Sequence, residues 1–547
     1  MTKENFLKRT SLGVVALTSV AVLAACGNSQ SSSSNKEINW AIPTEINTLD
    51  VSKNTDTYSS IALGNTGSNL LRVDEDGKLQ PDLATKVDVS KDGLTYTATL
   101  RKGIKWSDGS AIKAEDFVYS WQRILDPKTA SEYAFLGLAS NVENAEEINS
   151  GKITDLNQLG VKAEGNKVIF KLTKPSPQME YFLSFNSFLP QKKSFVEKAG
   201  KKYGTNADNQ IYSGPYVLKG WNGTNNKFTF VKNKNYWDAK NVKTDKVNIQ
   251  VVKKPETAVQ MYKSGKLDAA NISNTPAMYK ANKNSKDLVD VLEATSVYFQ
   301  YNQTGKVKAL SNTKIRQALN LATNREAFVK TVVPTGSRAA TGLAPYGLAK
   351  VNGKDLSTMV APGYKYDAAE AKRLFQEGLK EIGETSVKLT ITSDADSPIA
   401  KSSLDYIKGA WEKTLPGLTI EEKFVPFKQR LQDQTNANFD IVLSLWGGDY
   451  PEGSTFYGLF VTGNSQNNGK FSNATYDAQY QEAITTNALN PEKAAENFKA
   501  AEKALYDEAN INPLYFRSTK SLQNPKLVGI VRNTTGLSVD FTHAYKK

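Results

Sequence analysis

The sequence has little of the residues that most enzymes and metal proteins depend on. Its 547 residues include one histidine, His543, and one cysteine, Cys26. A single histidine cannot build a His-x-x-x-His zinc site, and a single cysteine cannot close an intramolecular disulfide. No Gly-x-Ser-x-Gly motif is present, and no Ser–His or Cys–His nucleophile pair is available. We therefore expect a protein that is not an enzyme and has no cofactor or metal, and we expect His543 at the surface.

Two further possibilities concern loops and carboxylates. Residues 463–470, GNSQNNGK, resemble a phosphate-binding loop only superficially, because five residues separate the glycines and no Ser or Thr follows the lysine. This stretch is interpreted as an ordinary loop. A pair of carboxylates for glycoside hydrolysis stays open, because two such groups approach each other in space and not in sequence.

Long hydrophobic runs are also missing after the first 25 residues. No later stretch approaches the ~20 apolar residues that a membrane-spanning helix needs. The chain is too long for one ordinary core, so two to four domains are expected. Its balance of hydrophobic and charged residues is typical of a globular protein.

The N-terminus has the pattern of a targeting segment. Lys3, Lys8 and Arg9 precede a short apolar stretch, residues 11–22. LAAC at 23–26 then resembles the lipobox of bacterial lipoproteins, in which the cysteine takes a diacylglyceryl group. A plain secretory signal is the alternative.

The lipobox predicts three things about the N-terminal region. Residues 1–25 would be a lipoprotein signal peptide, and residues 26–36 a flexible Ser-rich tether. Lipidation of Cys26 would anchor the protein to a membrane without spanning it. The expected location is the extracellular face of the cell membrane of a Gram-positive cell.

Basic residues exceed acidic ones, 69 against 56, which gives a net charge of +13. Such an excess favours an anionic partner. The lysines are scattered in ones and twos, however, as on a solvated surface, and nucleic acid is not expected outside the membrane. The charge is interpreted as compatibility with an anionic cell envelope.

The first part of the chain has the pattern of short strands joined by tight turns. Asp-Gly turns at 74–77 and 91–93 predict hairpins, and residues 96–100 and 168–172 predict strands. Residues 111–125 between them form an amphipathic helix pattern, whose apolar positions are Phe117, Val118, Trp121, Ile124 and Leu125.

The second half alternates strands and helices. A strand at 387–391, a helix at 400–414 and a strand at 418–424 precede the apolar run that ends at Trp446. This β-α-β-α-β order predicts a doubly wound α/β sheet, and the last run predicts a strand buried on both faces. Ligands of such sheets bind beyond the carboxyl ends of the strands. Asp449, after two glycines, lies in that position.

Several stretches together resemble one family, the oligopeptide-binding proteins of bacterial ABC importers within the peptide/nickel class of extracellular solute-binding proteins. The resemblance runs from about residue 38 to about residue 516. It departs at Lys113, where many members have a threonine that caps a helix. The blocks that carry the resemblance are LRKGIKWSDGSAIKAEDFVYSWQRILDPKTASEYA, SGPYVLKGW, NKNYWD, KIRQALNLATNREAFV and SLWGGDYPEG.

The resemblance implies a periplasmic-binding-protein-like fold of two α/β lobes that close on a ligand about a hinge. Lobe I would comprise residues 37–70, 205–294 and 515–547. An extra β-rich subdomain would occupy residues 71–204, and lobe II residues 295–514. A monomer is expected.

The resemblance also implies the site. Asp449 would hold the α-ammonium of a peptide, because a buried ammonium needs a charged partner. Gly447 and Gly448 would let the peptide main chain approach, and Trp446 would form a wall. The alternative for Asp449 is a turn cap. Main-chain groups at Ser444 and Leu445 are also expected to contact the peptide.

Tyr133 and Tyr515 are expected near the ligand as well, and the alternative for these two tyrosines is a position in the core. Trp106 and Trp121 are expected in the core.

The implied function is a receptor that captures oligopeptides, mainly through main-chain contacts, and delivers them to the permease and ATPase subunits of an ABC transporter. A receptor for one signalling (pheromone) peptide is the close alternative. A nickel or haem receptor is disfavoured by the single histidine. An adhesin or surface chaperone and an envelope hydrolase are weaker alternatives from other classes.

Overall fold

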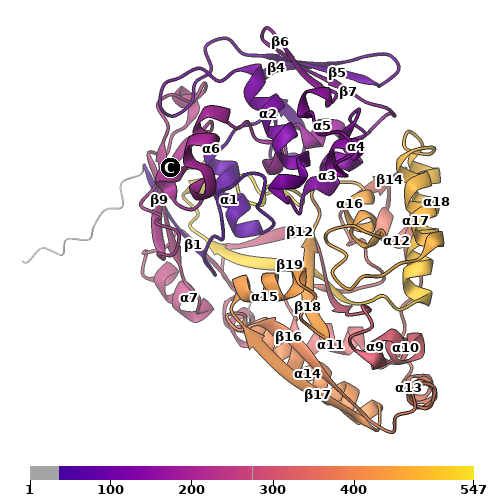
Figure 1. Ribbon diagram of the computed structural model, residues 1–547. Coiled ribbons are helices and arrows are strands. Elements are labelled where there is room, and N and C mark those ends of the chain that lie inside the picture. Colours follow the sequence, from indigo (N-terminus) through magenta and orange to yellow (C-terminus); the bar gives the residue numbers. More distant parts are fainter. Residues whose placement is uncertain (1–35, 274) are drawn as a thin grey trace, which may run out of the picture. The chain divides into compact units, whose positions relative to one another are not determined.

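The computed structural model describes residues 36–273 and 275–547, shown as ribbons in Figure 1. The segment that contains Cys26, the predicted signal peptide and almost all of the tether lies outside these residues. No helix in the described ranges is long and apolar enough to cross a membrane.

The first sheet begins the described chain. Its strand order is β1-β10-β9-β8, with β1 parallel to β10 and the other pairs antiparallel. Helix α1 (Thr57–Thr66) packs beside it, and the core between them includes Ile38, Phe230 and Phe541. The strands are β1 (Glu37–Ile42), β8 (Tyr216–Lys219), β9 (Lys227–Lys232) and β10 (Lys246–Val251).

A second, antiparallel sheet has the order β4-β5-β7-β6 and forms a core of its own with the helices beside it. Both predicted Asp-Gly hairpins are present, as β2–β3 and β4–β5, and the two predicted strands are β5 and β7. The strands are β2 (Leu71–Val73), β3 (Leu79–Pro81), β4 (Ala84–Val89), β5 (Thr95–Leu100), β6 (Val161–Glu164) and β7 (Lys167–Lys171).

The predicted amphipathic helix is α2 (Ala114–Leu125), which buries Phe117, Trp121, Ile124 and Leu125. Trp121 stacks on Phe188, with ring centroids 4.1 Å apart. Lys113 offers no side-chain cap, but Asp116 Oδ2 accepts a hydrogen bond from the Lys113 N–H at 2.9 Å, which replaces part of the cap. The neighbouring helices are α3 (Ala134–Ala139), α4 (Ala145–Asn149), α5 (Met179–Phe182) and α6 (Lys193–Ala199).

The third and largest sheet contains the strand that ends near Asp449. Its order is β11-β19-β12-β18-β16-β17, with β13 paired to β19. Strand β16 is parallel to β17 and to β18, as predicted, but β12 is antiparallel to both of its neighbours. The strands are β11 (Ala269–Asn271), β12 (Leu288–Tyr301), β13 (Arg338–Ala339), β16 (Val387–Asp394), β17 (Leu418–Val425), β18 (Ile441–Gly447) and β19 (Ile511–Gln523).

This sheet is mixed, because two long strands, β12 and β19, cross it beside the parallel strands β16, β17 and β18. Strands β12 and β19 pair antiparallel with each other over most of their lengths, with a register shift between positions 292 and 296. The predicted crossings between lobes, near 295 and 515, fall inside these two strands. The lobe boundaries themselves remain predictions.

Helices pack around the third sheet and beyond its ends. Residues 322–324 separate α10 from α11, and the predicted helix 400–414 is α14. The helices are α7 (Pro255–Lys263), α8 (Pro276–Asn282), α9 (Lys308–Ser311), α10 (Thr313–Leu321), α11 (Arg325–Val332), α12 (Leu356–Val360), α13 (Ala368–Ile382), α14 (Pro398–Thr414), α15 (Phe427–Thr435), α16 (Ser454–Tyr457), α17 (Ala474–Ile484) and α18 (Pro491–Asp507). A further hairpin joins β14 (Lys350–Val351) to β15 (Lys354–Asp355), and β20 (Leu527–Val528) pairs antiparallel with β21 (Tyr545–Lys546) at the end of the chain.

The predicted positions of two tryptophans, of the histidine and of one loop agree with the structure. Trp106 and Trp121 are core residues, each 1% exposed, and His543 is exposed. The stretch 463–470 is a loop.

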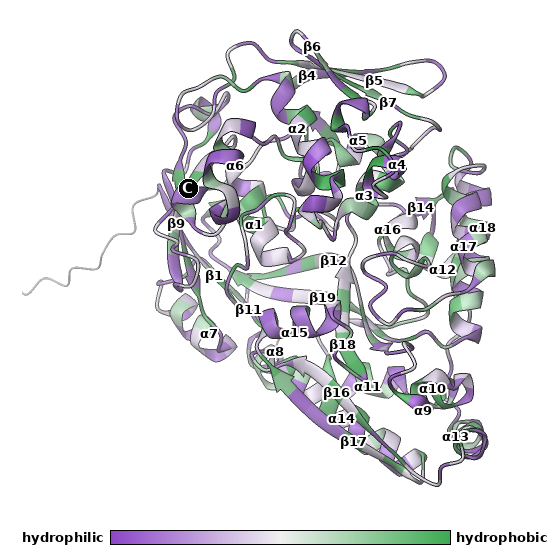
Figure 2. Cartoon of the chain, viewed as in Figure 1, coloured by the Kyte–Doolittle hydropathy of each residue, from purple (hydrophilic) through white to green (hydrophobic). Residues whose placement is uncertain are grey.

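Figure 2 shows apolar β18 in green beside the polar helix α15 in purple, so the third sheet carries a polar helix next to its apolar centre.

Candidate functional site

Strand β18 changes character along its length. Residues 441–444 are buried, whereas Leu445 is 38% exposed and Gly447 is exposed. The prediction of a strand buried on both faces is therefore correct only for its first half. The second half emerges from the core just before Asp449.

The same second half has an unpaired edge. Strand β12 pairs with all of β18, from Tyr301 opposite Ile441 to Thr295 opposite Gly447. Strand β16, on the other side, pairs only with Ile441 and Val442. Among the described residues, no strand pairs with that edge of β18 beyond Val442. Main-chain groups at 443–447 are thus available for an added strand.

Asp449 follows this edge and is buried, with 8% of its surface exposed. The Tyr133 hydroxyl donates a hydrogen bond to Asp449 Oδ1 at 3.2 Å, and the Thr455 hydroxyl donates to Oδ2 at 3.2 Å. Thr455 also accepts from the Asp449 N–H at 2.8 Å. Within the described chain, no lysine, arginine or histidine forms an ion pair with this carboxylate. A buried carboxylate without a cation is costly unless a ligand supplies one.

The pKa of Asp449 reflects this setting. Burial raises it to about 7, although the hydrogen bonds from Thr455 and Tyr133 act in the opposite direction. Near neutral pH the carboxyl group is therefore close to half ionised. A cation placed against it would favour the ionised form.

Aromatic rings line the same place. The ring of Tyr133 is nearly parallel to those of Trp446 and Phe185, at centroid distances of 6.0 and 5.8 Å and with interplanar angles of 19° in both pairs. The Trp446 Nε1–H is buried and forms no hydrogen bond of good geometry in the described chain, although it is near enough to Asp449 to lower the pKa of that carboxyl group. The stack brings the predicted residues Tyr133, Trp446 and Asp449 together, on elements more than 300 positions apart.

The two glycines before Asp449 differ in their surroundings. A Cβ atom at Gly448 would lie 2.9 Å from Leu348 and 3.1 Å from Thr535, so packing inside the protein requires glycine there. A Cβ atom at Gly447 would meet only the Thr295 hydroxyl, at 3.3 Å. The protein's own packing does not explain Gly447, whereas the approach of a ligand main chain would.

We expect Gly447→Ala to leave stability almost unchanged but to lower ligand affinity at least tenfold, because the new methyl group would project from the exposed end of β18, where the ligand main chain would approach. Thermal unfolding and calorimetric titration measure the two effects separately. Gly448→Ala is the matched control, and it should lower the melting temperature through overpacking. Unchanged affinity in Gly447→Ala would show that the ligand does not approach this edge.

Two other predicted residues lie deeper. The Ser444 side chain is buried and is hydrogen-bonded with Gln434 of α15 at 3.1 Å, which leaves its main chain for any ligand contact. Tyr515 is 5% exposed and stacks on Phe328 at 5.8 Å in the core of the large sheet. It is not in contact with Asp449, Tyr133 or Trp446, and this placement favours the core alternative.

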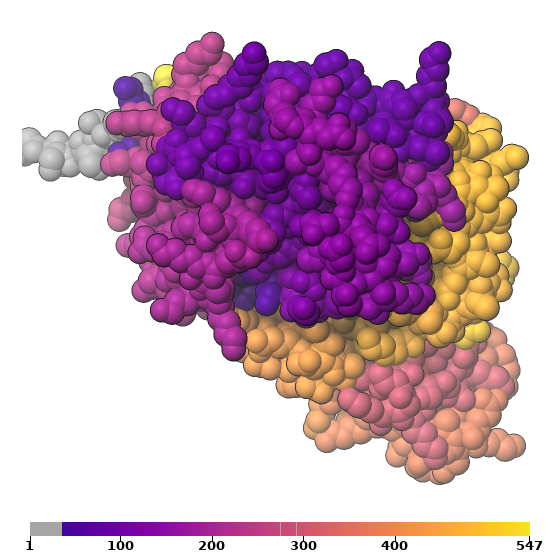
Figure 3. Space-filling view, turned by 45° about the horizontal axis from the view of Figure 1, so that its top comes forward, coloured from indigo at the N-terminus to yellow at the C-terminus, as the bar shows by residue number. Residues whose placement is uncertain are grey.

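Asp449 also lines a small cavity. Its volume is about 40 Å³, enough for a few water molecules but not for a peptide. The lining includes residues of the C-terminal segment, and Gly536 donates its N–H to the Gly448 carbonyl at 2.8 Å. Figure 3 shows the indigo-to-purple part of the chain packed against the gold part.

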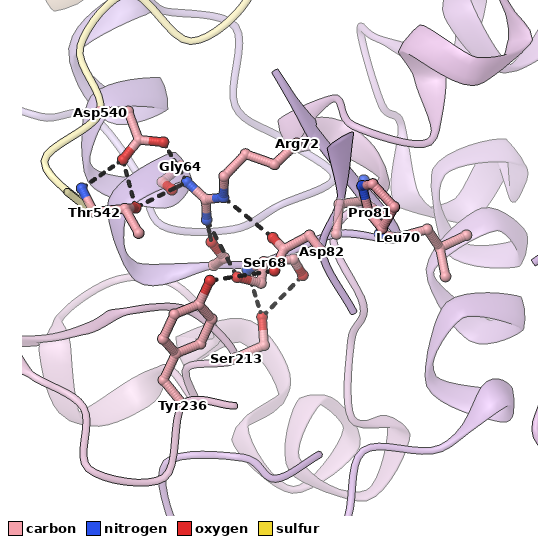
Figure 4. Close-up of polar contacts among 12 residues, drawn as sticks. Gly64, Ser68, Leu70, Arg72, Pro81, Asp82, Ser213, Tyr236, Asp540 and Thr542 are labelled. Atoms are coloured by element: carbon pink, nitrogen blue, oxygen red, sulfur yellow. Dashed lines mark hydrogen bonds and ion pairs between the residues drawn. The ribbon is translucent and has the colours of Figure 1, made fainter. Parts of the chain in front are cut away.

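Arg72 fixes the C-terminal segment that borders this cavity (Figure 4). Its Nη1 lies 2.5 Å from Asp540 Oδ2, and its Nε lies 3.2 Å from Asp82 Oδ2. A third contact runs from Nη2 to the Gly67 carbonyl at 3.0 Å. Burial by itself would raise the pKa of Asp540, but the guanidinium and Thr542 bring it below its ordinary value. The network ties α1, β2 and the chain terminus together.

The sequence did not reveal several residues of the site. Thr455 and Phe185 carry no motif, and Arg72 and Asp540 meet only through the fold.

Comparisons with known proteins agree with this geometry. The sequence model of the bacterial extracellular solute-binding proteins, family 5 Middle, matches residues 78–468. The chain is 44% identical to the dipeptide-binding protein of Lactococcus lactis subsp. cremoris, over 98% of each chain. Its structure resembles that of Listeria monocytogenes OppA bound to peptide, with a TM-score of 0.88, 34% identity and coverage of 94% and 100% of the two chains.

The structure of the pheromone receptor PrgZ is similar as well, with a TM-score of 0.88, 30% identity and coverage of 94% and 99%. These similarities confirm the expected two-lobed binding-protein fold and the expectation that the chain is not an enzyme. The chain belongs to family 5 of the bacterial extracellular solute-binding proteins.

Proposed function

We propose that the protein is the peptide receptor of an ABC importer, and that it holds a peptide along the open edge of β18 with the α-ammonium against Asp449. The observation that carries this proposal is a buried carboxylate without a cation at the end of an unpaired strand edge. Main-chain pairing supplies affinity for many sequences, and the carboxylate sets the register. The peptide-binding relatives support the substrate class.

Contacts across the site support binding by closure of two lobes. The Ser465 hydroxyl donates to the Glu132 carbonyl at 2.5 Å, and Thr435 donates to Glu132 Oε2 at 3.4 Å. Tyr58 packs edge-on against Phe427, with centroids 5.9 Å apart. The cavity at Asp449 is too small for a peptide in this arrangement, so entry of the ligand requires these contacts to open.

Native mass spectrometry of the protein without residues 1–26, purified without denaturation, tests the function. A heterogeneous set of added masses that fragment as short peptides is the expected result. Failure of the folded protein to retain or take up any peptide would contradict the proposal.

A receptor for a single signalling peptide is the second candidate, favoured by the likeness to PrgZ. The two functions differ in selectivity. A mixed peptide pool would displace the ligand of a nutrient receptor, whereas the ligand of a signalling receptor would resist the pool and yield only to its own sequence.

The rest of the function follows as part of the same proposal. Acylation of Cys26 would hold the body at the extracellular face of the membrane, where a monomer would deliver peptide to the permease and ATPase subunits. The residues concerned lie outside the described chain, and the pattern LAAC is their support. Metabolic labelling with a fatty acid, compared between wild type and Cys26→Ala, tests the anchor.

We expect peptide affinity to fall as the pH drops below 7. The bound α-ammonium requires ionised Asp449, whose pKa in the unliganded protein is raised to about 7, so protonation competes with binding. Between pH 7 and pH 5 the loss should be about 50-fold for one such group. Calorimetric titration at several pH values measures it. In Asp449→Asn the weak residual affinity should lack this dependence, and an equal slope in both proteins would contradict the assignment.

A further inference from the structure

Three carboxylates act on the phenol of Tyr133, and Asp449 is only one of them. The pKa of Tyr133 is raised well above its ordinary value, first by burial and then by Asp449, Asp56 and Glu132. Asp449 follows β18, Asp56 precedes α1, and Glu132 is next to Tyr133 in sequence. The fold thus gathers three acids at one aromatic ring.

Asp56 has an unusual arrangement for a helix cap. Its Oδ1 accepts hydrogen bonds from the N–H groups of Tyr58 and Ser59, at 3.0 and 2.8 Å, and so caps α1. Its Oδ2 is buried and has no hydrogen-bond partner in the described chain, in a residue that is 5% exposed. A buried acceptor without a donor is unfavourable by about 1–3 kcal/mol, and more when it is charged. A hydrogen-bond donor on a ligand would remove this free-energy cost.

No basic residue balances the group. Although the chain has 69 Lys and Arg against 56 Asp and Glu, none of the ion pairs in the described ranges involves Asp56, Glu132 or Asp449. The three acids do not form a metal site either, since no group of three or more His, Cys, Asp or Glu residues in those ranges has metal-binding geometry. The negative charge of these three carboxylates therefore favours an organic cation as the ligand.

The segments that carry Asp56 and Glu132 both contact helix α15, which lies beside β18. Two residues after Asp56, Tyr58 contacts Phe427 at the start of α15. Glu132 contacts Thr435 at the end of the same helix. Helix α15 is in turn hydrogen-bonded to Ser444 of β18 through Gln434. The segment with Asp56 thus contacts the first residue of α15 and Glu132 contacts its last, and the helix is hydrogen-bonded to β18 next to the open edge.

We infer that Asp56, assisted by Glu132, forms a second cation subsite that selects peptides with lysine or arginine among their first two residues. The inference rests on the proposed peptide-binding function. The α-ammonium neutralises Asp449, and a basic side chain next to it donates to the free Oδ2 of Asp56. Norleucine, which has the lysine side chain without its ammonium group, lacks this donor.

Calorimetric titration of four dipeptides tests the inference: Lys-Ala, norleucine-Ala, Ala-Lys and Ala-norleucine, each also extended by one alanine. Wild type should prefer the lysine peptide over its norleucine partner at least tenfold in one of the two positions. Asp56→Asn should abolish that preference and leave norleucine peptides unaffected. Asparagine caps helices as well as aspartate does, so α1 is preserved and unfolding temperatures verify it.

Two further variants separate the roles of the carboxylates. Asp449→Asn should weaken lysine and norleucine peptides alike, whereas Glu132→Gln should reduce the lysine preference partially. Equal binding of lysine and norleucine peptides by wild type would overturn the inference alone. Equal losses for both peptides in Asp56→Asn would do the same, because they would assign Asp56 a structural role. Absence of binding by all peptides would overturn the proposed function with it.

Discussion

Asp449→Asn is expected to lower the affinity for peptides with a free α-amino group by 100-fold or more at pH 7.5. The substitution keeps the size of the side chain and an oxygen that can accept from Tyr133 or Thr455. It removes the only charge that we place against the α-ammonium. A buried cation deprived of its partner costs about 3–5 kcal/mol, which corresponds to a factor of 100 or more in the dissociation constant.

N-acetylated peptides provide the control, because they have no ammonium to lose. Their affinity for wild type should be low, and the substitution should change it little or improve it. Calorimetric titration of one peptide in both forms against both proteins completes a double-mutant cycle. Equal losses for the free and acetylated forms would refute the ammonium anchor.

The same substitution should stabilise the unliganded protein. Because burial raises the pKa of Asp449 above its unfolded value, the folded state holds the proton more tightly, and the stability of wild type declines as the pH rises through about 7. Asparagine has no such dependence, so the variant should melt at a higher temperature than wild type at pH 8, and at a similar one at pH 4. Loss of binding together with a gain in stability is typical of a functional residue and excludes misfolding as the cause.

Sequence periodicity predicted local elements well and their assembly less well. The helix with Phe117 and Trp121, the Asp-Gly hairpins and the run into Gly447-Gly448 all have strong local patterns. The antiparallel neighbour of β18 could not be found in this way. It is β12, about 150 residues earlier in the chain, and its pairing depends on the long crossing strands.

The residues of the site likewise divide into those that local sequence patterns or the family resemblance predicted and those that only the assembled fold brings together. Asp449 was identified from its place after a strand and from the family resemblance, and Trp446 and Tyr133 from the resemblance. Tyr515 had the same support, but its ring packs with Phe328 instead. The unpaired Oδ2 of Asp56 and the position of Arg72 depend on contacts between segments that are distant in sequence, and no local pattern encodes those.

Arg72→Met is expected to destabilise the protein by about 3–5 kcal/mol at neutral pH, because it leaves two buried carboxylates without their cation. The side chains of Asp82 and Asp540 are 2% and 3% exposed, and that of Arg72 is 17% exposed. Methionine preserves most of the apolar volume, so the loss is chiefly electrostatic. Denaturant unfolding measures it.

Arg373→Met is the matched control, because Arg373 also contacts two carboxylates, Glu370 and Glu377, but at the exposed surface of α13. Exposed pairs contribute little, so its unfolding should resemble that of wild type. A loss in Arg72→Met as small as that of Arg373→Met would contradict the structural role of the network.

The pH dependence of the Arg72→Met effect identifies its cause. Because the pKa of Asp540 is lowered in the folded protein, its contribution to stability is present above its unfolded pKa of about 4 and disappears as the pH falls through the folded value. The difference between wild type and Arg72→Met should therefore narrow towards pH 3.5. Adding Asp540→Asn to Arg72→Met should restore part of the stability at pH 7, since it removes an uncompensated charge. A loss that is independent of pH and of Asp540 would instead assign the effect to packing, and hydrogen bonds such as those to Gly448, Ala294 and Tyr216 would then hold the C-terminal segment beside Asp449.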